Sequence, residues 1–429
     1  MSKIIMHIDL NAFFATAQVI KEPELEGKPL IIAGKTRRGI VSTASYEARK
    51  YGINSAMPTY MALKLCPNVI VRDVDFELYH RLSEQFFNYV KKYTKIIEIA
   101  SIDECYADMT EAMKDVKNPE QYLKNLQDEL YRETKLKCSI GLAPTKFLAK
   151  MGSDYKKPMG ITIIRRKDVQ KIIWPLKIKD MFGIGKKTYP RLEMLGIKKI
   201  GDLAVSEDPA VKKLLGKFYY VLKDWCYGRG NDIVQVEPED PKSISTSTTF
   251  LFDTDDYEDI KAMIYEKASE VSLRAKEEKK LGTTITLTVK DSNFVTKNKS
   301  ITIKEATNDV DVIYNNAINL YEKYVKSIPL RLVGVALSNL MNTDKFYVQM
   351  SLFDYQKHKE ECATRLLIDE LNNKMKKKVL IRASDLRGKK NENNWCFRYV
   401  LPKYFLWEEC FTSNFKMLSR RYECIYFFL

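Results

Sequence analysis

Three acidic residues have the side-chain type and the surroundings that metal-assisted chemistry requires. Asp9 ends an apolar run, and Asp103 and Glu104 stand side by side between two more apolar-rich runs. Nucleotidyl transfer assisted by two metal ions needs several carboxylates at one point, with Mg²⁺ held by one or two of them and by substrate phosphates. Without a cation, clustered carboxylates repel one another and raise one another's pKa. These three residues are our candidate catalytic and metal-binding set.

The elements around these acidic residues must bring them together. The run before Asp9 predicts a strand, so Asp9 lies at the carboxyl end of that strand. Side chains next to each other in a regular strand point to opposite faces, so Asp103 and Glu104 would diverge there. Strands predicted over residues 96–102 and 105–109 instead place the pair at a hairpin turn, at one sheet edge with Asp9. The turn lacks the Gly or Asn that tight hairpins favour, which is mild evidence of function, but spacing alone is equally compatible with a solvated acidic turn.

The composition predicts a soluble multidomain protein with a polyanionic partner. A chain of 429 residues is long enough for roughly two to four domains, and 45% hydrophobic and 30% charged residues are typical of globular proteins. No apolar run approaches the roughly 18 to 20 residues of a membrane span, so a membrane protein is not expected. The net charge of +15 and the pI near 9.1 favour nucleic acid, with a ribosomal or anionic-membrane surface as the alternative.

The amino terminus and the cysteines both indicate a cytoplasmic protein. The segment MSKIIMHIDL does not have the pattern of a secretory signal. The eight cysteines are spread thinly, and none forms a Cys-x-x-Cys pair or stands near a His at zinc-ligand spacing. We therefore expect free thiols in a reduced compartment.

The order of the predicted elements indicates an α+β multidomain fold. Strands alternate with helices in the first part of the chain, and a small subdomain is inserted after the first strand. A helical segment follows, then the polar, Pro-rich linker VEPEDPKS, and then a β-α-β-β-α-β unit. The predicted domains are residues 1–10 with 74–164, the insertion 11–73, the helical segment 165–235, the linker 236–243, the β-α-β-β-α-β unit 244–341, an extension 342–389 and an aromatic-rich tail 390–429 to which no role is assigned.

Five segments, in one order, resemble the Y-family DNA polymerases. Within that family they resemble the DinB and UmuC branch of bacteria. They are MHIDLNAFFA, STASYEARKYGI, EIASIDECYADM, KKPMGI and MFGIGKKTYPRLEMLGI. The resemblance implies a right-hand polymerase in which the domains above are, in order, palm, short fingers, helical thumb, linker and βαββαβ little finger. It also implies template-dependent addition of dNTPs to a primer 3′-hydroxyl, with low fidelity, in translesion synthesis and damage tolerance.

The resemblance also implies the metal ligands and the main partners. Asp9, Asp103 and Glu104 are expected to bind two Mg²⁺ ions, which Mn²⁺ can replace, and the backbone carbonyl of Leu10 adds a ligand. One metal lowers the pKa of the primer 3′-hydroxyl, and the other binds the triphosphate and the leaving pyrophosphate. Primer-template DNA and dNTPs are the expected substrates of a protein that acts as a monomer.

A second set of residues is expected to bind the dNTP. Thr43, Tyr46 and Arg49 recur at a spacing of three across a predicted strand-to-helix junction, so they can share one face. The family presents matching residues to the triphosphate, and Lys157, directly before Pro158, matches a family lysine that also meets the phosphates. Taken alone, the same residues fit an N-cap Thr and an exposed Arg.

Two adjacent aromatic residues complete this set. Phe14 matches the family position that stacks under the sugar and excludes the 2′-hydroxyl of ribonucleotides. Phe13 is grouped with it, although the amphipathic pattern of the predicted helix favours a core position for Phe13.

DNA-binding surfaces are predicted in two places. In FGIGKKTYPRLEMLGIKKIGDL, glycines open a turn between two short helices and resemble a helix-hairpin-helix, whose backbone amides and lysines bind phosphate without reading sequence. In the β-α-β-β-α-β unit, lysines around adjacent strands are expected to contact the backbone in a DNA groove. An ordinary helical turn and a solvated charged face are the alternatives. The candidate residues are Gly183, Gly185, Lys186, Lys187, Lys290 and Lys297.

The segment QMSLF, residues 349–353, resembles the short peptide with which bacterial polymerases bind the sliding clamp. Exposed Leu352 and Phe353 would fill an apolar pocket on that partner, with Gln349 beginning the motif. Packing against the chain's own surface is the alternative.

Two other functions remain open. A nucleotidyl cyclase can also use paired acids on a palm-like sheet, but it gives no reason for the thumb-like hairpin and the little-finger-like unit. A non-catalytic DNA-binding or clamp-binding accessory factor would leave the three acids idle.

Overall fold

The computed structural model describes residues 3–325 and 328–343, residues 367 and 371, and two short strands at 380–382 and 425–427. The chain divides into two compact units, Met1–Leu340 and Met341–Leu429. In the second unit, strands β13 (Leu380–Arg382) and β14 (Ile425–Phe427) pair antiparallel. The predicted clamp-binding residues Gln349, Leu352 and Phe353 lie outside the described residues.

A five-stranded sheet with the strand order β5-β6-β1-β7-β8 lies in the first unit. Its strands are β1 (Ile5–Leu10), β5 (Ile97–Ser101), β6 (Glu104–Asp108), β7 (Cys138–Ala143) and β8 (Ile161–Ile163). The central strand β1 pairs antiparallel with β6 and β7, and all six of its residues are buried. Because both faces of β1 are covered, its sequence is a nearly continuous apolar run without alternation.

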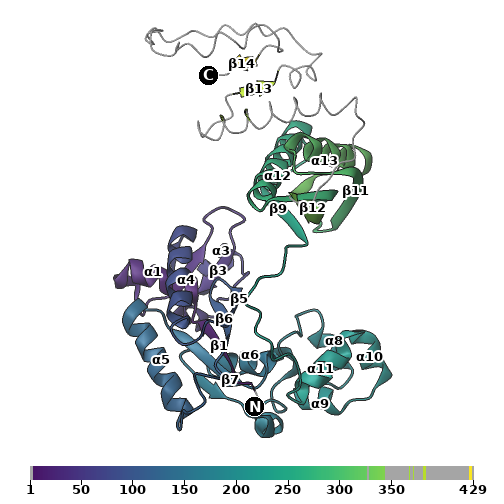
Figure 1. The fold of residues 1–429 in the computed structure, drawn as a ribbon. Helices are drawn as coiled ribbons and strands as arrows, with labels where there is room; N and C mark the ends of the chain where they lie inside the picture. The colour runs from purple at the N-terminus through teal and green to yellow at the C-terminus, as the bar shows by residue number, and fades with distance from the viewer. Residues whose placement is uncertain are drawn as a thin grey trace. The chain divides into compact units, whose positions relative to one another are not determined.

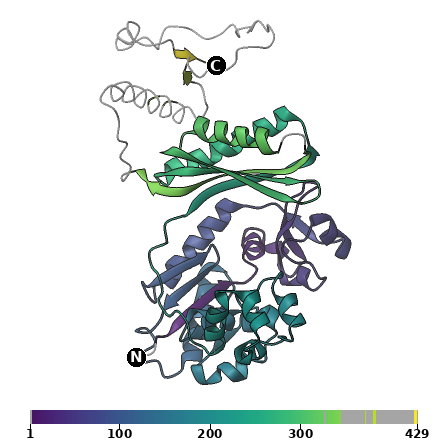
Figure 2. The same cartoon turned by 90° about the vertical axis from the view of Figure 1, so that its right-hand side faces the viewer.

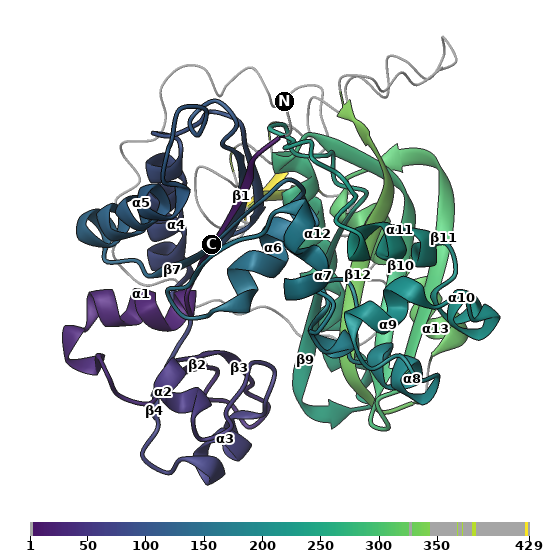
Figure 3. The same ribbon diagram turned by 90° about the horizontal axis from the view of Figure 1, so that it is seen from below.

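Three helices cover one face of this sheet: α1 (Phe13–Lys21), α4 (Phe76–Val90) and α5 (Pro119–Thr134). Met6, Ile8 and Leu10 alternate along β1 toward these helices and join one apolar core with them. Asp75 and Asn118 accept hydrogen bonds from backbone N–H groups of α4 and α5, which fixes where these helices begin. Figure 3 shows α4 and α5 on one side of β1, with α6 (Lys146–Tyr155) on the other side.

Helix α6 (Lys146–Tyr155) covers the other face, and the side chain of Thr145 caps its first turn. A glycine makes the contact possible, because a Cβ on Gly141 of β7 would lie 1.9 Å from the backbone oxygen of Ala149. The helix therefore lies directly on the sheet. Odd-numbered residues of β1 point to this face, so Asp9 lies beneath α6.

A three-stranded sheet with the order β3-β2-β4 follows α1 in the chain. Its elements are the 3-10 turn η1 (Pro23–Leu25), β2 (Leu30–Ala33), β3 (Val41–Ala44), α2 (Tyr46–Arg49), α3 (Thr59–Leu65) and β4 (Ile70–Arg72). Ile31 and Ala33 face a small separate core, whereas Leu30 and Ile32 belong to the core of the five-stranded sheet. Alternate side chains of β2 thus pack into two different cores.

The chain between β8 and residue 227 is helical, as the sequence predicts. Its elements are η2 (Arg166–Asp168), α7 (Val169–Ile172), η3 (Ile178–Asp180), α8 (Tyr189–Met194), α9 (Ile200–Val205), α10 (Pro209–Leu215) and α11 (Phe218–Cys226). Figure 1 shows α8 to α11 gathered into one bundle. Phe147 of α6 stacks on Trp225 of α11 with ring centroids 4.9 Å apart, so α6 lies between the sheet and this bundle.

The predicted β-α-β-β-α-β unit is confirmed and forms a four-stranded sheet with the order β11-β10-β12-β9. Its elements are β9 (Ser243–Thr254), α12 (Tyr257–Glu277), β10 (Lys280–Asp291), β11 (Thr296–Thr307), α13 (Val310–Tyr324) and β12 (Leu330–Asn342). Both helices pack on one face of the sheet (Figure 2). Ile285, Leu287 and Val289 alternate toward the helices, so the residues between them point to the face that neither helix covers.

In the part of the chain that the structure describes, no helix has both the length and the apolar surface to cross a membrane. Cys66, Cys105, Cys138 and Cys226 are buried free thiols, as predicted for the cysteines as a group. Burial raises the pKa of the Cys226 thiol to about 12, so this thiol stays protonated.

Candidate active site

The register of two strands brings Asp9 and Glu104 together. They are directly opposite each other in the β1–β6 pair, so their side chains share one face of the sheet. Asp9 is buried and Glu104 is half-buried. With His7 they form a cluster in which one ligand atom from each residue lies within 4.8 Å of the others. One cation can bind all three residues in this arrangement.

Asp103 lies in the hairpin turn between β5 and β6, as predicted, but Glu104 does not. Ser101 pairs with Glu104, which is therefore the first residue of β6, and the expectation that both acids sit in the turn is wrong for Glu104. Ser101 Oγ donates a 2.6 Å hydrogen bond to Asp103 Oδ1. Asp103 does not belong to the three-residue cluster of His7, Asp9 and Glu104. The backbone N–H of Leu10 donates to the carbonyl of Asp103 at 2.9 Å and ties the turn to β1.

Two lysines bind the paired carboxylates. Lys150 Nζ donates to Asp9 Oδ2 at 2.9 Å and to Glu104 Oε2 at 2.6 Å. Lys157 Nζ donates to Asp9 Oδ1 at 2.6 Å and lies 2.8 Å from Asp154 Oδ1. Their ammonium groups supply the positive charge that clustered carboxylates need.

Sequence reasoning missed Lys150. The signal that could have found it is helical spacing, because Lys150, Asp154 and Lys157 recur at intervals of four and three after a buried strand. Such spacing predicts a charged helix face but not the sheet face that it covers. Gly141, which admits the helix, gives no local indication of that contact.

The two carboxylates differ in their electrostatic surroundings. Burial would raise the pKa of Asp9, but the ammonium groups of Lys150 and Lys157 outweigh burial and hold that pKa below its usual value. Burial raises the pKa of Glu104, and the charge of Asp9 adds to this rise, while Lys150 offsets only part of it. Asp9 therefore stays ionised, and a further cation would stabilise the ionised form of Glu104 most.

His7 is fully buried, and its two ring nitrogens have different surroundings. Nδ1 lies 2.8 Å from Ser153 Oγ, and Ser153 Oγ donates its own proton to the backbone oxygen of Lys150 at 2.9 Å. Nδ1 therefore carries the proton and donates to Ser153. The unprotonated Nε2 has no hydrogen-bond partner among the described residues and lies 3.6 Å from Glu104 Oε2. Burial and the charge of Lys150 lower the pKa of His7 to about 3, so the ring is neutral near pH 7.

The residues predicted to bind the triphosphate lie at the junction of β3 and α2. Thr43 belongs to β3, Tyr46 and Arg49 are the first and last residues of α2, and the helix is capped by Ser45 rather than by Thr43. The guanidinium of Arg49 lies over the ring of Tyr46, 4.6 Å from its centroid. Burial raises the pKa of Tyr46, and the charges of Arg49 and Lys157 oppose this rise. The junction is thus within electrostatic range of the carboxylate site.

The two predicted aromatic residues have different environments. Phe13 is buried in the core of the five-stranded sheet, which is the packing position that its helical pattern favours. Phe14 is half-buried, stacks on Tyr79 at a centroid distance of 4.2 Å and meets Phe76 edge to face. Of these two candidate residues, Phe14 is the more accessible.

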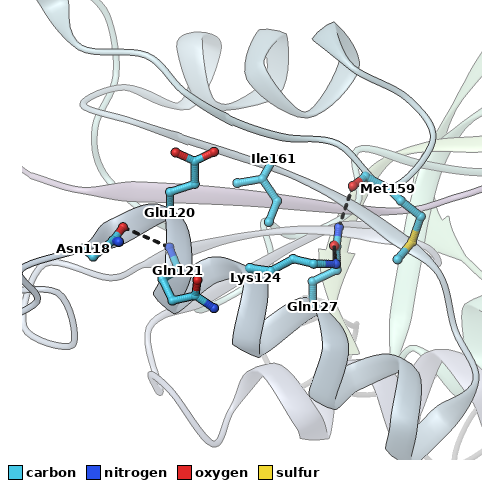
Figure 4. A pocket seen from close by; sticks show the side chains of 7 residues that line it. All are labelled: Asn118, Glu120, Gln121, Lys124, Gln127, Met159 and Ile161. Atoms are coloured by element: carbon cyan, nitrogen blue, oxygen red, sulfur yellow. Dashed lines mark hydrogen bonds between the residues drawn. The ribbon is translucent and has the colours of Figure 1, made fainter.

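Gln127 of α5 fixes the segment that follows Lys157. It is buried and donates hydrogen bonds to the backbone oxygens of Cys138 at 2.9 Å and Met159 at 3.0 Å. Figure 4 shows the second contact in the wall of a pocket of about 450 Å³. The pocket is lined by Asn118, Glu120, Gln121, Lys124, Gln127, Met159 and Ile161. None of the predicted site residues lines it, so it is separate from the carboxylate site.

The predicted helix-hairpin-helix turn lies between η3 and α8. Gly183 has a φ of +91°, and a Cβ there would lie 3.3 Å from two aromatic rings of α11. The carbonyl of Gly185 accepts a 2.9 Å hydrogen bond from the N–H of Thr188. Lys186 and Lys187 are exposed beside this turn. The backbone conformation therefore requires Gly183, and the neighbouring lysines are accessible to an anion.

The two lysines predicted on the four-stranded sheet lie on opposite faces. Lys297 pairs with Val289, whose side chain points to the helices, so Lys297 points to the same side. Lys290 pairs with Thr296 and points to the uncovered face. The predicted DNA contacts of these two lysines would therefore lie on different faces of the sheet. Two side chains on neighbouring strands can lie close in the sheet and still point to opposite faces.

Comparisons with known proteins identify the family of the chain. Residues 8–154 match the impB/mucB/samB family, residues 166–197 match the HHH motif of the IMS family, and residues 241–352 match the impB/mucB/samB family C-terminal domain. Together these matches cover more than half of the chain.

Curated relatives and a solved structure resemble most of the chain. It is 35% identical to DNA polymerase IV 1 of Bacillus subtilis (strain 168) over 399 residues, which are 91% of this chain and 95% of that relative. It is 38% identical to DNA polymerase IV of Listeria monocytogenes serotype 4a over 341 residues, 79% of this chain and 96% of the relative. The solved structure of a Y-family DNA polymerase chimera matches with a TM-score of 0.71 and 28% identity, covering 79% of this chain and 99% of the chimera.

Proposed function

The chain belongs to the impB/mucB/samB family and is a DNA-directed DNA polymerase, and we propose that it adds deoxynucleotides to a primer 3′-hydroxyl at Asp9, Asp103 and Glu104. Relatives named DNA polymerase IV and the Y-family structure support a translesion polymerase, and neither a nucleotidyl cyclase nor a non-catalytic accessory factor is favoured. The observation that carries the proposed site is the cross-strand pairing of Asp9 with Glu104 beneath α6.

The residues of the site fit a divalent cation. Two carboxylates and a neutral histidine nitrogen converge, and the carboxylates already bind two ammonium groups in place of a metal. Two Mg²⁺ ions, which Mn²⁺ can replace, would be held by Asp9, Asp103, Glu104 and the carbonyl of Leu10, because hard cations prefer oxygen ligands. When bound, the metal lowers the pKa of the 3′-hydroxyl and neutralises charge on the triphosphate.

Side chains around the carboxylates bind and orient the nucleotide in this proposal. The triphosphate is bound by Lys157, Tyr46 and Arg49. The charged side chains of Lys157 and Arg49 both lie close enough to act on the hydroxyl of Tyr46. Thr43 contributes a hydroxyl from the end of β3. Phe14, which is held by its stack on Tyr79, lies under the sugar and excludes a 2′-hydroxyl.

We extend the proposal to the domains and to DNA. The five-stranded sheet is the palm, the three-stranded sheet lies in the fingers, the helical segment is the thumb and the four-stranded sheet is the little finger. Gly183, Gly185, Lys186 and Lys187 bind DNA phosphates, and Lys290 adds a contact on the uncovered sheet face. A DNA substrate supports a cytoplasmic location. Binding to a sliding clamp and a monomeric state stay predictions.

The substitution Asp103→Asn tests the site. It keeps the side-chain size and an acceptor for Ser101 but removes the charge, so Mg²⁺-dependent primer extension should fall by about a thousandfold or more. DNA binding, measured by fluorescence anisotropy, should stay close to that of the wild type. Asp128→Asn on α5 is the matched control, because Asp128 is exposed and pairs with Lys124 instead. Substantial extension by Asp103→Asn would sink the assignment.

A further inference from the structure

Lys150 occupies the space between the two carboxylates that are proposed to hold metal. Its ammonium group contacts Asp9 Oδ2 at 2.9 Å and Glu104 Oε2 at 2.6 Å, and its side chain is only 12% exposed. The lone pair of His7 Nε2 faces the same Glu104 oxygen at 3.6 Å. The protein therefore supplies its own cation to this site.

A metal ion and this ammonium group compete for the same two oxygens. Both carry positive charge, and at ligand distances their repulsion in a half-buried site is strong. Metal binding therefore favours displacement of Lys150 from at least one carboxylate. An ammonium group that loses its carboxylates while it stays buried is strongly unfavourable, so the displaced group needs a new anionic partner.

The surroundings of Lys150 limit the choice of that partner. Asp154, one turn further along α6, lies 3.5 Å from Lys150 but already binds Lys157 at 2.8 Å. Lys157 in turn binds the other oxygen of Asp9. The two lysines thus share a limited set of carboxylates. A phosphate group that arrives beside them would supply the negative charge that both ammonium groups need when a metal takes their carboxylates.

We propose that Lys150 is a positioning residue that keeps the carboxylate site closed to metal until a nucleoside triphosphate arrives to accept its ammonium group. This inference rests on the proposed function and deepens it, because it couples the two ligands of the same site. Metal binding releases Lys150 toward the phosphates, and phosphate binding releases the carboxylates toward the metal. Such coupling is reciprocal, so each ligand strengthens the binding of the other by the same factor.

The substitution Lys150→Met gives opposite effects on the two ligands. It removes the competing charge, so Mn²⁺ alone should bind about tenfold tighter than to the wild type, as counted by the electron paramagnetic resonance signal of free Mn²⁺. It also removes a phosphate contact, so a fluorescent dNTP with Ca²⁺ and without DNA should bind about tenfold more weakly. A merely structural role would weaken both ligands.

Three further variants of the full-length protein make the result decisive. Lys146→Met is the matched control, because Lys146 lies one turn earlier on α6 and pairs with Glu98 outside the site, so both affinities should stay at wild-type values. Lys150→Arg keeps the charge and should keep the weak Mn²⁺ binding of the wild type. Lys150→Gln repeats the test if the methionine variant fails to fold.

The outcomes separate this inference from the proposed function. Wild-type protein that does not extend primers would remove the proposed function itself. Wild-type protein that extends primers, with Lys150→Met binding Mn²⁺ no tighter than the wild type, would overturn the role of Lys150 alone. Tighter Mn²⁺ binding together with weaker dNTP binding supports the coupling.

Discussion

The five-stranded and the four-stranded sheet both carry helices on one face, but they differ in what lies on the other. In the five-stranded sheet, α6 covers the second face, and charged groups from β1 and β6 are enclosed with their partners. In the four-stranded sheet, neither helix covers the second face. One sheet thus encloses its polar groups, and the other displays them.

The displayed face carries hydroxyl groups that bond each other across the β10–β11 pair. Thr284 Oγ1 lies 3.0 Å from Thr302 Oγ1, and Thr286 Oγ1 lies 2.9 Å from Ser300 Oγ across the β10–β11 pair. Short, uncharged side chains of this kind keep a sheet face flat and able to approach a sugar-phosphate backbone. The contrast is between a sheet whose charged groups are enclosed and held by their partners and a sheet whose polar face stays accessible.

Adding one methyl group to each sheet tests the contrast in packing. In Gly141→Ala the new Cβ would lie 1.9 Å from the backbone oxygen of Ala149, so α6 must move, and we expect about 3 kcal/mol or more of lost stability. In Gly334→Ala the nearest atom is the Cβ of Ser247 at 2.7 Å, on a face that can relax toward solvent, so about 1–2 kcal/mol is expected. Hydrogen exchange resolved by peptide reports each sheet separately. A larger loss for Gly334→Ala would break the comparison.

The enclosed charges of the five-stranded sheet also predict a dependence on pH. Burial would raise the pKa of Asp108, but hydrogen bonds from Lys3 and Thr110 hold it below its usual value. The carboxylate therefore stabilises the fold above its unfolded pKa of about 3.9, and this contribution is lost as the pH falls through the lower folded pKa. Solvent screens the charge of Lys3, which is partly exposed, so we expect Asp108→Asn to lower the free energy of unfolding by only about 1–2 kcal/mol near pH 7. This difference in stability between the wild type and the variant should narrow below about pH 4.

Urea midpoints between pH 3 and pH 8 measure that gap. The matched control is Asp291→Asn at the end of β10, where the side chain accepts hydrogen bonds from the N–H groups of Asn293 and Val295. An asparagine accepts the same bonds, so the free energy of unfolding at pH 7 should change by less than about 0.5 kcal/mol. A gap for Asp108→Asn that widens toward acid pH would contradict the sign derived above.

The sequence predicts elements better than it predicts contacts between them. The alternation of Ile285, Leu287 and Val289 predicts a strand with one covered face, and the apolar run before Asp9 predicts a strand that ends in an acid. Both patterns are local, because burial repeats with the period of the element. The β-α-β-β-α-β order and the hairpin position of Asp103 follow from such patterns.

Strand register and helix docking are not local, and for this reason sequence reasoning misplaced Glu104 and missed Lys150. Glu104 belongs to β6 because it pairs with Asp9, almost a hundred positions earlier in the chain. Lys150 reaches both acids because Gly141 lets α6 lie against the sheet. Lys290 and Lys297 separate because one strand's alternation is set by its partner.

That separation provides the smallest but most selective prediction, because it compares the same substitution on two faces of one sheet. If the uncovered face binds DNA, Lys290→Gln removes one phosphate contact. The slope of log affinity against log salt concentration should then fall by about 1, with a similar weakening on every sequence. Fluorescence anisotropy on a primer-template at several salt concentrations measures the slope.

Lys297→Gln is the control, since Lys297 points to the helix side beside Val325 at the end of α13. Its slope should match that of the wild type although the net charge changes by the same amount. Equal slopes for both variants would mean that DNA responds to total charge and not to one face. In that case the open sheet would differ from the enclosed sheet in packing only, and the binding surface would have to be sought beside the exposed lysines of the helix-hairpin-helix turn.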